Sequence, residues 1–216
     1  MNIKTLVMIR LACFDLDGTL VTETNTFRFI AEKLGFLDMI LEYEEKERLG
    51  LLPDNKKVAQ DTANLFKGIS TETIKELLSD VPRIANIEPT VTELKKRGLI
   101  LILASIQWDF LVEPFATEYG FDSYCGTGMK IQNDILTGEL ENFCTAQDKL
   151  QYFLSVCNDY NIPASDTIAI GDSKSDHPVF KEVGTSIVLN ADGETKKLAT
   201  HSIETDDLLD ILPFFK

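Results

Sequence analysis

Two aspartates at the end of a short apolar run are the residues of this sequence best suited to do chemistry. Leu11 to Phe14 has the pattern of a buried strand, and Asp15-Leu16-Asp17-Gly18 follows it directly. Asp-Gly is a turn signal, so the strand is expected to stop on its carboxylates. In open α/β sheets, ligands bind at the carboxyl ends of the strands. The pattern therefore indicates a site, although Asp-Gly is also typical of an ordinary turn.

Polar residues follow two later apolar runs as well. Residues 99–104 predict a second buried strand that stops on Ser105, and residues 167–170 predict a third that ends on Gly171-Asp172. In a parallel sheet, these strand ends lie beside the first one at one edge. Acidic residues from separate strands repel one another there. A bound Mg²⁺, which takes oxygen ligands, commonly offsets this repulsion. We therefore expect Mg²⁺ as a cofactor, whereas oxygen-only ligands exclude a dedicated zinc site.

Two charged residues near predicted helix starts could complete such a site. Thr145-x-x-Asp148 resembles a capping box, which places Lys149 in the first turn of a helix, where an anion is also favoured. Taken alone, Lys149 would be expected to be a solvated lysine. Asp176, in the loop after the third strand, could either support the site or cap the helix that begins near Pro178.

Length and composition restrict both fold and function. The chain has 216 residues, 44% hydrophobic and 26% charged, which predicts one globular domain, or one domain with a modest insertion. The 21 Lys and Arg against 35 Asp and Glu give a formal net charge of -14, which argues against nucleic-acid binding. The four cysteines are widely spaced, as expected for free thiols in a reducing cytoplasm. Lys4 and Arg10 interrupt the apolar N-terminal segment, so neither a signal peptide nor a membrane span is expected.

Helical patterns dominate the region between the first two strands. Between residues 21 and 89 no strand is predicted, and apolar residues at helical spacing indicate several amphipathic helices. Alternation of strands and helices resumes after this region and includes a β-ribbon. The expected helices cover residues 27–34, 38–49, 56–67 after a break at Pro53, 74–81, 89–97 with Pro89 as the first residue, 109–119, 145–157, 178–183 and 206–215, while the ribbon covers residues 129–141 and a fourth strand residues 186–189.

The motifs, in this order, resemble the four sequence motifs of the haloacid dehalogenase-like hydrolases. The resemblance covers residues 1–20 and about 90–216, which it implies are a catalytic core. The all-helical insert, residues 21–89, resembles the cap of the phosphoserine phosphatase-like branch. The implied fold class is α/β, with a Rossmann-like three-layer core, a parallel sheet and a small all-helical cap domain inserted after the first strand. The matching residues are Asp15-Leu16-Asp17-Gly18-Thr19, Ser105, Lys149 and Gly171-Asp172-x-x-x-Asp176.

The resemblance also implies a mechanism for hydrolysing a phosphomonoester. Asp15 would form an aspartyl-phosphate, and Asp17 would act as general acid and base. Mg²⁺ would be held by the Asp15 carboxylate, the Asp17 backbone carbonyl and Asp172. Asp176 would orient the metal shell. The implied phosphoryl-binding residues are Ser105 and Lys149.

Phosphoserine, the substrate of that branch, does not match the residues found at two of its expected binding positions. Thr24 stands where phosphoserine phosphatases have a glutamate for the substrate amine, with Glu23 one residue earlier, and Gln60 aligns with their carboxylate-binding arginine. We therefore expect a small phosphorylated metabolite, and phosphoserine is disfavoured because its carboxylate would go unpaired. Gln107, Glu23 and Trp108 are candidate selectors, although Trp108 fits a core position equally well.

Two alternative functions are consistent with the same residues. The aspartyl-phosphate could pass its phosphoryl group to an acceptor alcohol instead of water. The chain could also be a non-enzymatic phosphate-binding or phospho-acceptor module, although Asp17 is unnecessary for binding. No nucleic-acid or membrane partner is expected, and nothing in the sequence indicates an oligomeric state.

Overall fold

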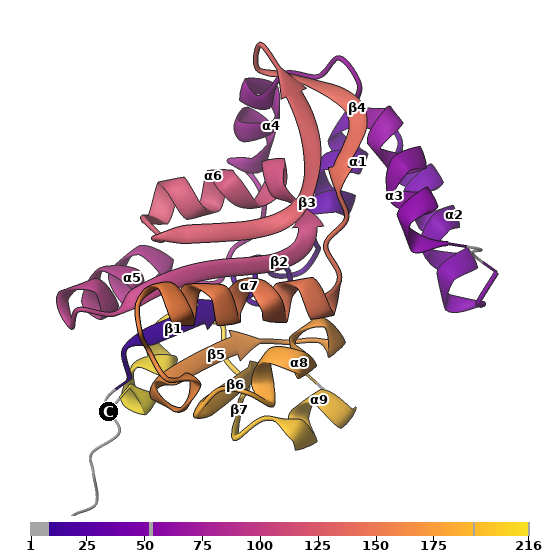
Figure 1. Ribbon diagram of the computed structural model, residues 1–216. Coiled ribbons are helices and arrows are strands. Elements are labelled where there is room, and N and C mark those ends of the chain that lie inside the picture. The colour runs from indigo at the N-terminus through magenta and orange to yellow at the C-terminus, as the bar shows by residue number, and fades with distance from the viewer. Residues whose placement is uncertain (1–8, 52–53, 192, 216) are drawn as a thin grey trace, which may run out of the picture.

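A seven-stranded sheet runs through the centre of the computed structural model, which describes residues 9–51, 54–191 and 193–215 (Figure 1). The apolar N-terminal segment before Ile9 and the predicted break at Pro53 lie outside the described residues. The strands are β1 (Leu11–Phe14), β2 (Ile100–Trp108), β3 (Ser123–Gln132), β4 (Ile135–Asn142), β5 (Thr167–Gly171), β6 (Thr185–Leu189) and β7 (His201–Ile203). They lie in the order β4-β3-β2-β1-β5-β6-β7, and every neighbouring pair is parallel except the antiparallel hairpin of β3 and β4.

Helices cover both faces of this sheet and make the core three layers deep. On one face Phe14, Leu103 and Ile170 pack against helices from three parts of the chain, and on the other face Cys13 and Ala104 pack against a second set. Because successive strand residues point to opposite faces and both faces are covered, β1 and the first half of β2 are continuous apolar runs. The first set comprises α5 (Ile87–Lys96), α6 (Asp109–Tyr119) and the 3-10 helix η4 (Leu208–Phe214); the second comprises α7 (Ala146–Asp159) and α8 (His177–Phe180).

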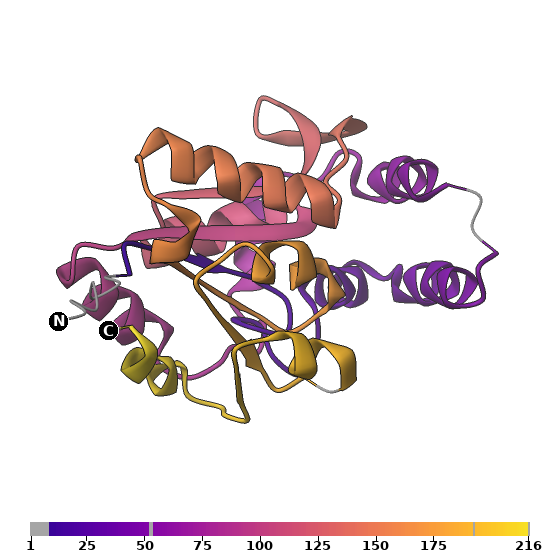
Figure 2. The same ribbon diagram turned by 60° about the horizontal axis from the view of Figure 1, so that its bottom comes forward.

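The region between β1 and β2 is helical, as predicted, and part of it extends away from the sheet. Its elements are α1 (Thr26–Leu34), α2 (Leu37–Arg48), α3 (Asn55–Ala63), the 3-10 helix η1 (Asn64–Phe66) and α4 (Thr71–Leu78). α2 and α3 project from the body in both views, and Figure 2 shows them as two separate rods (Figures 1 and 2). Side-chain caps at Asn25, Asp54 and Ser70 begin α1, α3 and α4, which explains why these short helices start where they do.

The β3–β4 hairpin packs along this helical insert. The Gly68 amide donates to Leu136 O at 2.8 Å, and the Leu136 amide donates to Ile69 O at 2.9 Å. Gln60 on α3 forms two further hydrogen bonds to β4, donating from Nε2 to Gly138 O at 2.8 Å and accepting the Leu140 amide at 3.1 Å. The hairpin therefore ties the insert to the sheet, while the predicted division at residues 21–89 stays a prediction.

One correction concerns the strand that carries Ser105. The sequence predicts that this strand stops on Ser105, but β2 continues to Trp108, where it pairs with Thr127 of β3. Its register with β3 shifts between Ala104 and Trp108, so the segment around Ser105 is irregular although the strand goes on. Pairing with β3 beyond the end of β1 is a long-range effect that the local pattern does not encode.

Smaller differences occur at five other elements. α5 begins at Ile87, which makes Pro89 its third residue, still in the first turn, where a missing N–H costs nothing. α8 is only His177–Phe180, and the C-terminal segment forms a 3-10 helix that contains Pro213 instead of an α-helix. The sequence analysis also missed β7 and α9 (Gly193–Leu198), which are too short for a clear periodic pattern. The remaining short 3-10 helices are η2 (Ala164–Asp166) and η3 (Lys174–Asp176).

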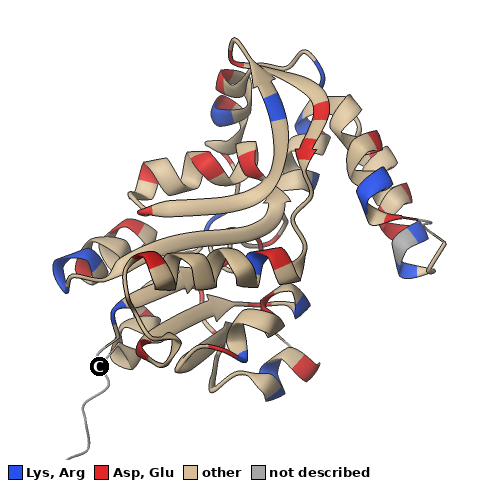
Figure 3. Ribbon diagram, viewed as in Figure 1, with Lys and Arg blue, Asp and Glu red and all other residues tan. Residues whose placement is uncertain are grey.

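Charged residues are mixed over the surface elements. In the view of Figure 3, Lys and Arg lie scattered among Asp and Glu on the helices of the core and of the insert. The four cysteines are all free thiols. Within the described ranges no helix is both long and apolar enough to cross a membrane.

Candidate active site

Parallel pairing brings the predicted strand ends together. Phe14 of β1 is in register with Leu103 of β2 on one side and with Ile170 of β5 on the other. The residue after Phe14 is Asp15, whose amide donates to Ile170 O at 2.9 Å. Asp15 is 5% exposed, so its carboxylate lies in the interior of the molecule at the carboxyl edge of the sheet.

The turn after Asp15 depends on Gly18. Gly18 has a φ of +83°, in the left-handed region that favours glycine. A Cβ atom at this position would lie 2.2 Å from Asp172 Oδ2, so the absence of a side chain also lets the β5 loop approach. The sequence analysis assigned Gly18 to the turn, but its second role depends on a residue far along the chain.

The Asp17 carboxylate is held by the start of α1 and by the end of β2. Its Oδ1 accepts the Thr26 amide at 2.7 Å, and its Oδ2 accepts the Thr26 hydroxyl at 3.0 Å and Gln107 Nε2 at 3.3 Å. Burial raises the pKa of Asp17, and the hydrogen bonds from Thr26 and Gln107 oppose that shift. The sequence analysis missed Thr26. Its only local signal is a hydroxyl residue at the first position of a helix.

Lys149 reaches the same place from α7. The predicted capping box is present, since Thr145 accepts the Asp148 amide and Asp148 accepts the Thr145 amide. This start directs Lys149 inward, where it is 1% exposed and its Nζ donates to Asp15 Oδ1 at 2.7 Å and to Asp176 Oδ1 at 2.6 Å. Burial alone would lower the pKa of Lys149, but the two carboxylates outweigh it and hold that pKa above its usual range.

Asp176 supports the loop that carries Asp172. Its Oδ2 accepts the backbone amides of Asp172 at 3.1 Å and of Ser173 at 3.0 Å, while its Oδ1 accepts Lys149. Asp176 is the N-cap residue of α8 by position, but its side chain makes no cap hydrogen bond to that helix. The Asp176 side chain instead accepts the Ser173 amide in the capping box of η3, so it caps this helix start and also contacts Lys149, while its role in supporting a metal shell stays a prediction.

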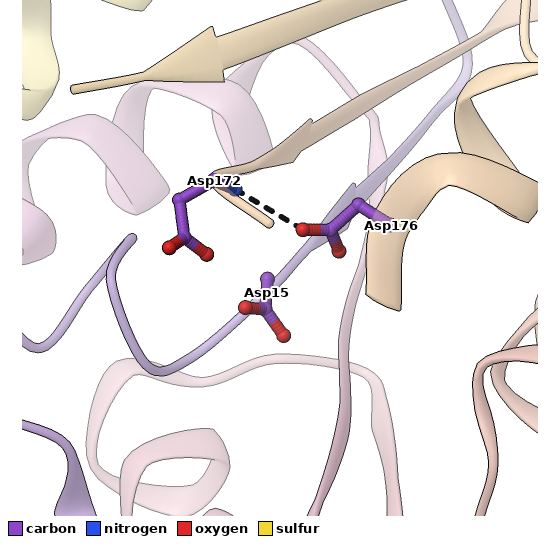
Figure 4. Close-up of side chains that lie close together, drawn as sticks. All are labelled: Asp15, Asp172 and Asp176. Atoms are coloured by element: carbon purple, nitrogen blue, oxygen red, sulfur yellow. Dashed lines mark hydrogen bonds between the residues drawn. The ribbon is translucent and has the colours of Figure 1, made fainter. Parts of the chain in front are cut away.

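Three carboxylates converge at the centre of the site. Oxygen atoms of Asp15, Asp172 and Asp176 lie within 4.8 Å of one another (Figure 4). Burial is the main cause that raises the pKa of Asp15 well above its usual range and that of Asp172 to about 7, and the neighbouring carboxylates add to both shifts. Lys149 is the cation that pairs with this cluster, so negative charge remains in excess.

The carboxylate cluster fits a divalent cation. Asp172 Oδ1 is buried and has no hydrogen-bond partner among the residues that the structure describes. A buried oxygen of this kind needs a partner, and Mg²⁺ binds oxygen ligands from one or two carboxylates. The carboxylates of Asp15 and Asp172 therefore fit the predicted cofactor, whereas both oxygens of Asp176 already accept hydrogen bonds from the protein.

Ser105 and Gln107 lie on the irregular part of β2. Ser105 is 3% exposed, and its Oγ accepts the Gln107 amide at 3.2 Å. Because that bond uses a lone pair of the hydroxyl, the Ser105 proton stays available for a second partner. Glu23, by contrast, is exposed and has a φ of +65°.

A pocket of about 280 Å³ opens beside Gln107, between the insert and the end of β2. Trp108 lies in its wall and is also 4% exposed and stacked on Phe110, so this residue belongs to the core and to the pocket at once. Glu23 is not among the pocket residues. The other wall residues come from α1, α2, α3, the end of β2 and the segments that contain Thr127, Phe143 and Cys144.

Comparison with known proteins identifies the family. The sequence model of the haloacid dehalogenase-like hydrolases matches residues 12–181. The chain belongs to this family. The match spans the Asp15 strand, the helical insert, β2, α7 and the Asp172 loop, and therefore includes every motif on which the predicted resemblance rested.

The relatives lie in one branch of these haloacid dehalogenase-like hydrolases. The phosphoserine phosphatase of Methanocaldococcus jannaschii is 26% identical over 208 residues, which are 96% of this chain and 98% of the relative. That of Archaeoglobus fulgidus is 24% identical over 208 residues, and the chain spans 60% of its length. A solved structure of a phospho-aspartyl intermediate analogue of phosphoserine phosphatase is 26% identical in sequence and superposes with a TM-score of 0.79. The matched region covers 97% of this chain and 100% of the other. These findings confirm the predicted branch and its α/β core with a helical cap.

Proposed function

We propose that the chain is a Mg²⁺-dependent phosphatase that hydrolyses a small phosphomonoester through an aspartyl-phosphate on Asp15. The observation that carries this proposal is the buried Asp15 carboxylate, paired with Lys149 Nζ at 2.7 Å and placed beside a second aspartate that is independently held. A binding module has no need of that second carboxylate. The phosphoserine phosphatase relatives support phosphomonoester hydrolysis as the reaction class.

Asp15 is the nucleophile in this mechanism. Lys149 donates to Oδ1 of Asp15, which leaves the other carboxylate oxygen to attack the phosphorus. The bond from phosphorus to the leaving oxygen breaks as the bond to Asp15 forms, so one difficult displacement becomes two easier ones. Lys149 also places a positive charge beside the transferring phosphoryl group, where negative charge is concentrated.

Asp17 is the general acid and base. Thr26 and Gln107 fix its carboxylate, and burial raises its pKa, which favours the protonated form needed to protonate the leaving alcohol. After the alcohol has left, the Asp17 carboxylate takes a proton from the water that attacks the aspartyl-phosphate. Ser105, whose own proton is free, donates to a phosphoryl oxygen.

Mg²⁺ would be held by the Asp15 and Asp172 carboxylates with the Asp17 backbone carbonyl, while Asp176 fixes the Asp172 loop. When bound, it supplies positive charge that offsets the clustered carboxylates and the phosphoryl oxygens. Residues 21–89 act as the cap that selects the substrate, and the free thiols support the predicted cytoplasmic location.

Release of inorganic phosphate tests the proposal. We expect wild-type protein to hydrolyse an aryl phosphate in Mg²⁺ and to lose that turnover in chelator. Asp15→Asn should reduce it by at least ~10³-fold. Asp38→Asn, at an exposed position of α2, is the matched control and should keep the wild-type rate. Absence of turnover from folded protein in Mg²⁺ would contradict the proposal.

Two other product patterns would identify the alternative functions in place of hydrolysis. Phosphoryl transfer would give phosphorylated alcohol when an acceptor alcohol is added, at the expense of inorganic phosphate. A phospho-acceptor module would accumulate a stable acyl-phosphate on Asp15 without turnover, detected by intact mass before and after hydroxylamine treatment.

A further inference from the structure

We infer that the pocket beside Gln107 binds the alcohol part of the substrate and selects an uncharged, largely apolar group. This inference rests on the proposed function, because it assigns the pocket to the leaving group of the phosphomonoester. The pocket has a volume of about 280 Å³, close to the lower end of small-molecule sites, ~300 Å³.

The position of the pocket identifies it with the leaving group. Gln107 lies in the pocket wall and donates to Asp17 Oδ2 at 3.3 Å. The proposed general acid is therefore one hydrogen bond from the pocket. Asp15 and Lys149 are not among the wall residues, so the phosphoryl group and the alcohol occupy adjoining but different spaces.

The walls of the pocket are mainly hydrocarbon. Aromatic side chains come from several elements, and aliphatic side chains of α2, α3 and β2 lie between them. Aromatic and branched apolar surfaces of this kind bind a ring or a branched chain by removing it from water. The aromatic wall residues are Phe27, Tyr43, Trp108 and Phe143.

Three polar side chains of the wall, those of Thr62, Thr127 and Gln107, form hydrogen bonds within the protein. The Thr62 hydroxyl donates to backbone carbonyls of its own helix, and the Thr127 hydroxyl donates to Ile106 O at 2.8 Å and accepts the Cys144 amide at 3.2 Å. Gln107 uses Nε2 for Asp17 and Oε1 for the Trp108 amide. These three side chains therefore offer a charged ligand little hydrogen bonding to replace its water.

The charge in the wall is also neutralised. Glu44 is the charged wall residue among those described, and both of its carboxylate oxygens accept Arg28 Nε at 2.9 Å. Arg28 is consequently committed to Glu44 and is itself outside the wall. An ammonium group gains no free anion here, and a carboxylate gains no free cation.

The arginine expected for a substrate carboxylate has no substitute in this pocket. Gln60, which stands at its aligned position, uses both ends of its amide on the β3–β4 hairpin. Arg83 is bound to Glu118 and Tyr119 on the far side of α6. Gln60 and Arg83 are thus bound to the hairpin and to α6, respectively.

A matched set of three esters tests the inference. Benzyl phosphate, para-carboxybenzyl phosphate and para-aminomethylbenzyl phosphate share one scaffold and differ in the para substituent, which is hydrogen, an anionic carboxylate or a cationic aminomethyl group. We expect kcat/KM for benzyl phosphate to exceed that for either charged ester, and for phosphoserine, by at least ~30-fold. A charged ester or phosphoserine that equals or exceeds benzyl phosphate would overturn the inference.

An arginine introduced into the wall sharpens the test. Asn55→Arg should raise kcat/KM for para-carboxybenzyl phosphate relative to benzyl phosphate by about 10-fold, because a guanidinium pairs with a carboxylate. Asn64→Arg adds the same charge at an exposed position outside the wall and should leave the ratio unchanged. An equal gain in both variants would show that the alcohol does not occupy this pocket.

A binding measurement distinguishes failure of the proposed phosphatase function from failure of the proposed role of the pocket. Trp108 is the one tryptophan of the sequence and lies in the wall, so its fluorescence reports on the pocket without turnover. If no ester is hydrolysed, the proposed function fails, and the three free benzyl alcohols still test selection. A fluorescence change at lower concentration for benzyl alcohol than for its charged analogues supports an apolar pocket, and the opposite order overturns it.

Discussion

The carboxylate cluster at the strand ends and the pocket in the insert use polar residues in opposite ways. At the strand ends, Asp15, Asp172 and Lys149 are buried or partly buried, and negative charge remains in excess. In the pocket, Glu44 is paired with Arg28, and the other polar groups bond mainly to the protein. The strand ends keep negative charge that no residue in the described ranges pairs, whereas the charge in the pocket wall is paired within the protein.

Under the proposed function, this difference separates the residues that react from the residues that select the substrate. Uncompensated buried charge lowers stability and persists where a ligand completes it. A neutral apolar wall can distinguish substrates without taking part in the reaction. The strand-end residues are therefore expected to control rate and metal binding, while residues of the insert control substrate choice and local stability.

The largest expected effect is at Lys149. Lys149→Met leaves the Asp15 and Asp176 carboxylates buried without their cation, which should cost about 3 to 5 kcal/mol of unfolding free energy. Activity should fall by at least ~10³-fold because the charge beside the phosphoryl group is lost. Chemical denaturation and steady-state kinetics measure both effects. Lys57→Met, at an exposed position of α3, is the control. Near wild-type activity in Lys149→Met would contradict the role of charge at the strand ends.

The next effect is at Asp172 and tests whether the carboxylates at the strand ends bind a metal ion. Asp172→Asn removes one negative charge from the cluster, so the Mg²⁺ concentration needed for half-maximal activity should rise by about 10- to 100-fold. In chelator, the variant should be more stable by about 1 kcal/mol because a repelling buried charge is gone. A Mg²⁺ titration and thermal unfolding in chelator measure the two effects.

Asp159→Asn, at an exposed position of α7, controls for the loss of a carboxylate and should change neither quantity. A variant that keeps the wild-type Mg²⁺ requirement would show that Asp172 is not a ligand.

A smaller effect is expected at Gln60, where the insert meets the hairpin. Gln60→Ala leaves Gly138 O and the Leu140 amide without their side-chain partner and should cost about 1 to 2 kcal/mol. Turnover of benzyl phosphate should change little, because Gln60 lies outside the reacting groups. Urea denaturation compared with Gln151→Ala, at an exposed position of α7, measures the cost. A large loss of turnover with unchanged stability would assign Gln60 to the substrate instead.

The smallest effect is a pH dependence of stability at Asp109. Burial raises the pKa of Asp109 to about 6, above its unfolded value of about 3.9. The folded state therefore keeps the proton longer, so the stability that Asp109 contributes is present below about pH 4 and is lost as pH rises through 6. The side chain is partly exposed and lies at the start of α6, so solvent screening and the helix dipole reduce the effect to about 1 kcal/mol.

Asp109→Asn keeps the acceptor of the Phe110 and Met129 amides but cannot ionise. It should match the wild type near pH 4 and be more stable near pH 7.5, measured by denaturation at both values. The same difference at both values would contradict this origin.

The ends of β1 and β5 were predictable because their signals are local, whereas β2 continues past Ser105. Each buried strand is an apolar run, and the polar residue that follows it is visible in the sequence. The capping box is a local signal of the same kind, and it correctly predicts that Lys149 lies in the first turn of α7. The parallel pairing of β1 with β5 then brings Asp15 and Asp172 to one edge with no further information.

Only the tertiary structure decided how the groups are paired. The bond from Thr26 to Asp17, the pairing of Arg28 with Glu44 and the use of Gln60 on the hairpin join elements whose spacing follows no local rule. Periodicity reports which face of an element is buried, but it does not report which polar partner stands across from it. The sequence by itself thus determined the candidate site residues and the fold class, and the packing of the insert against β2 and the hairpin determined the pocket and its neutral wall.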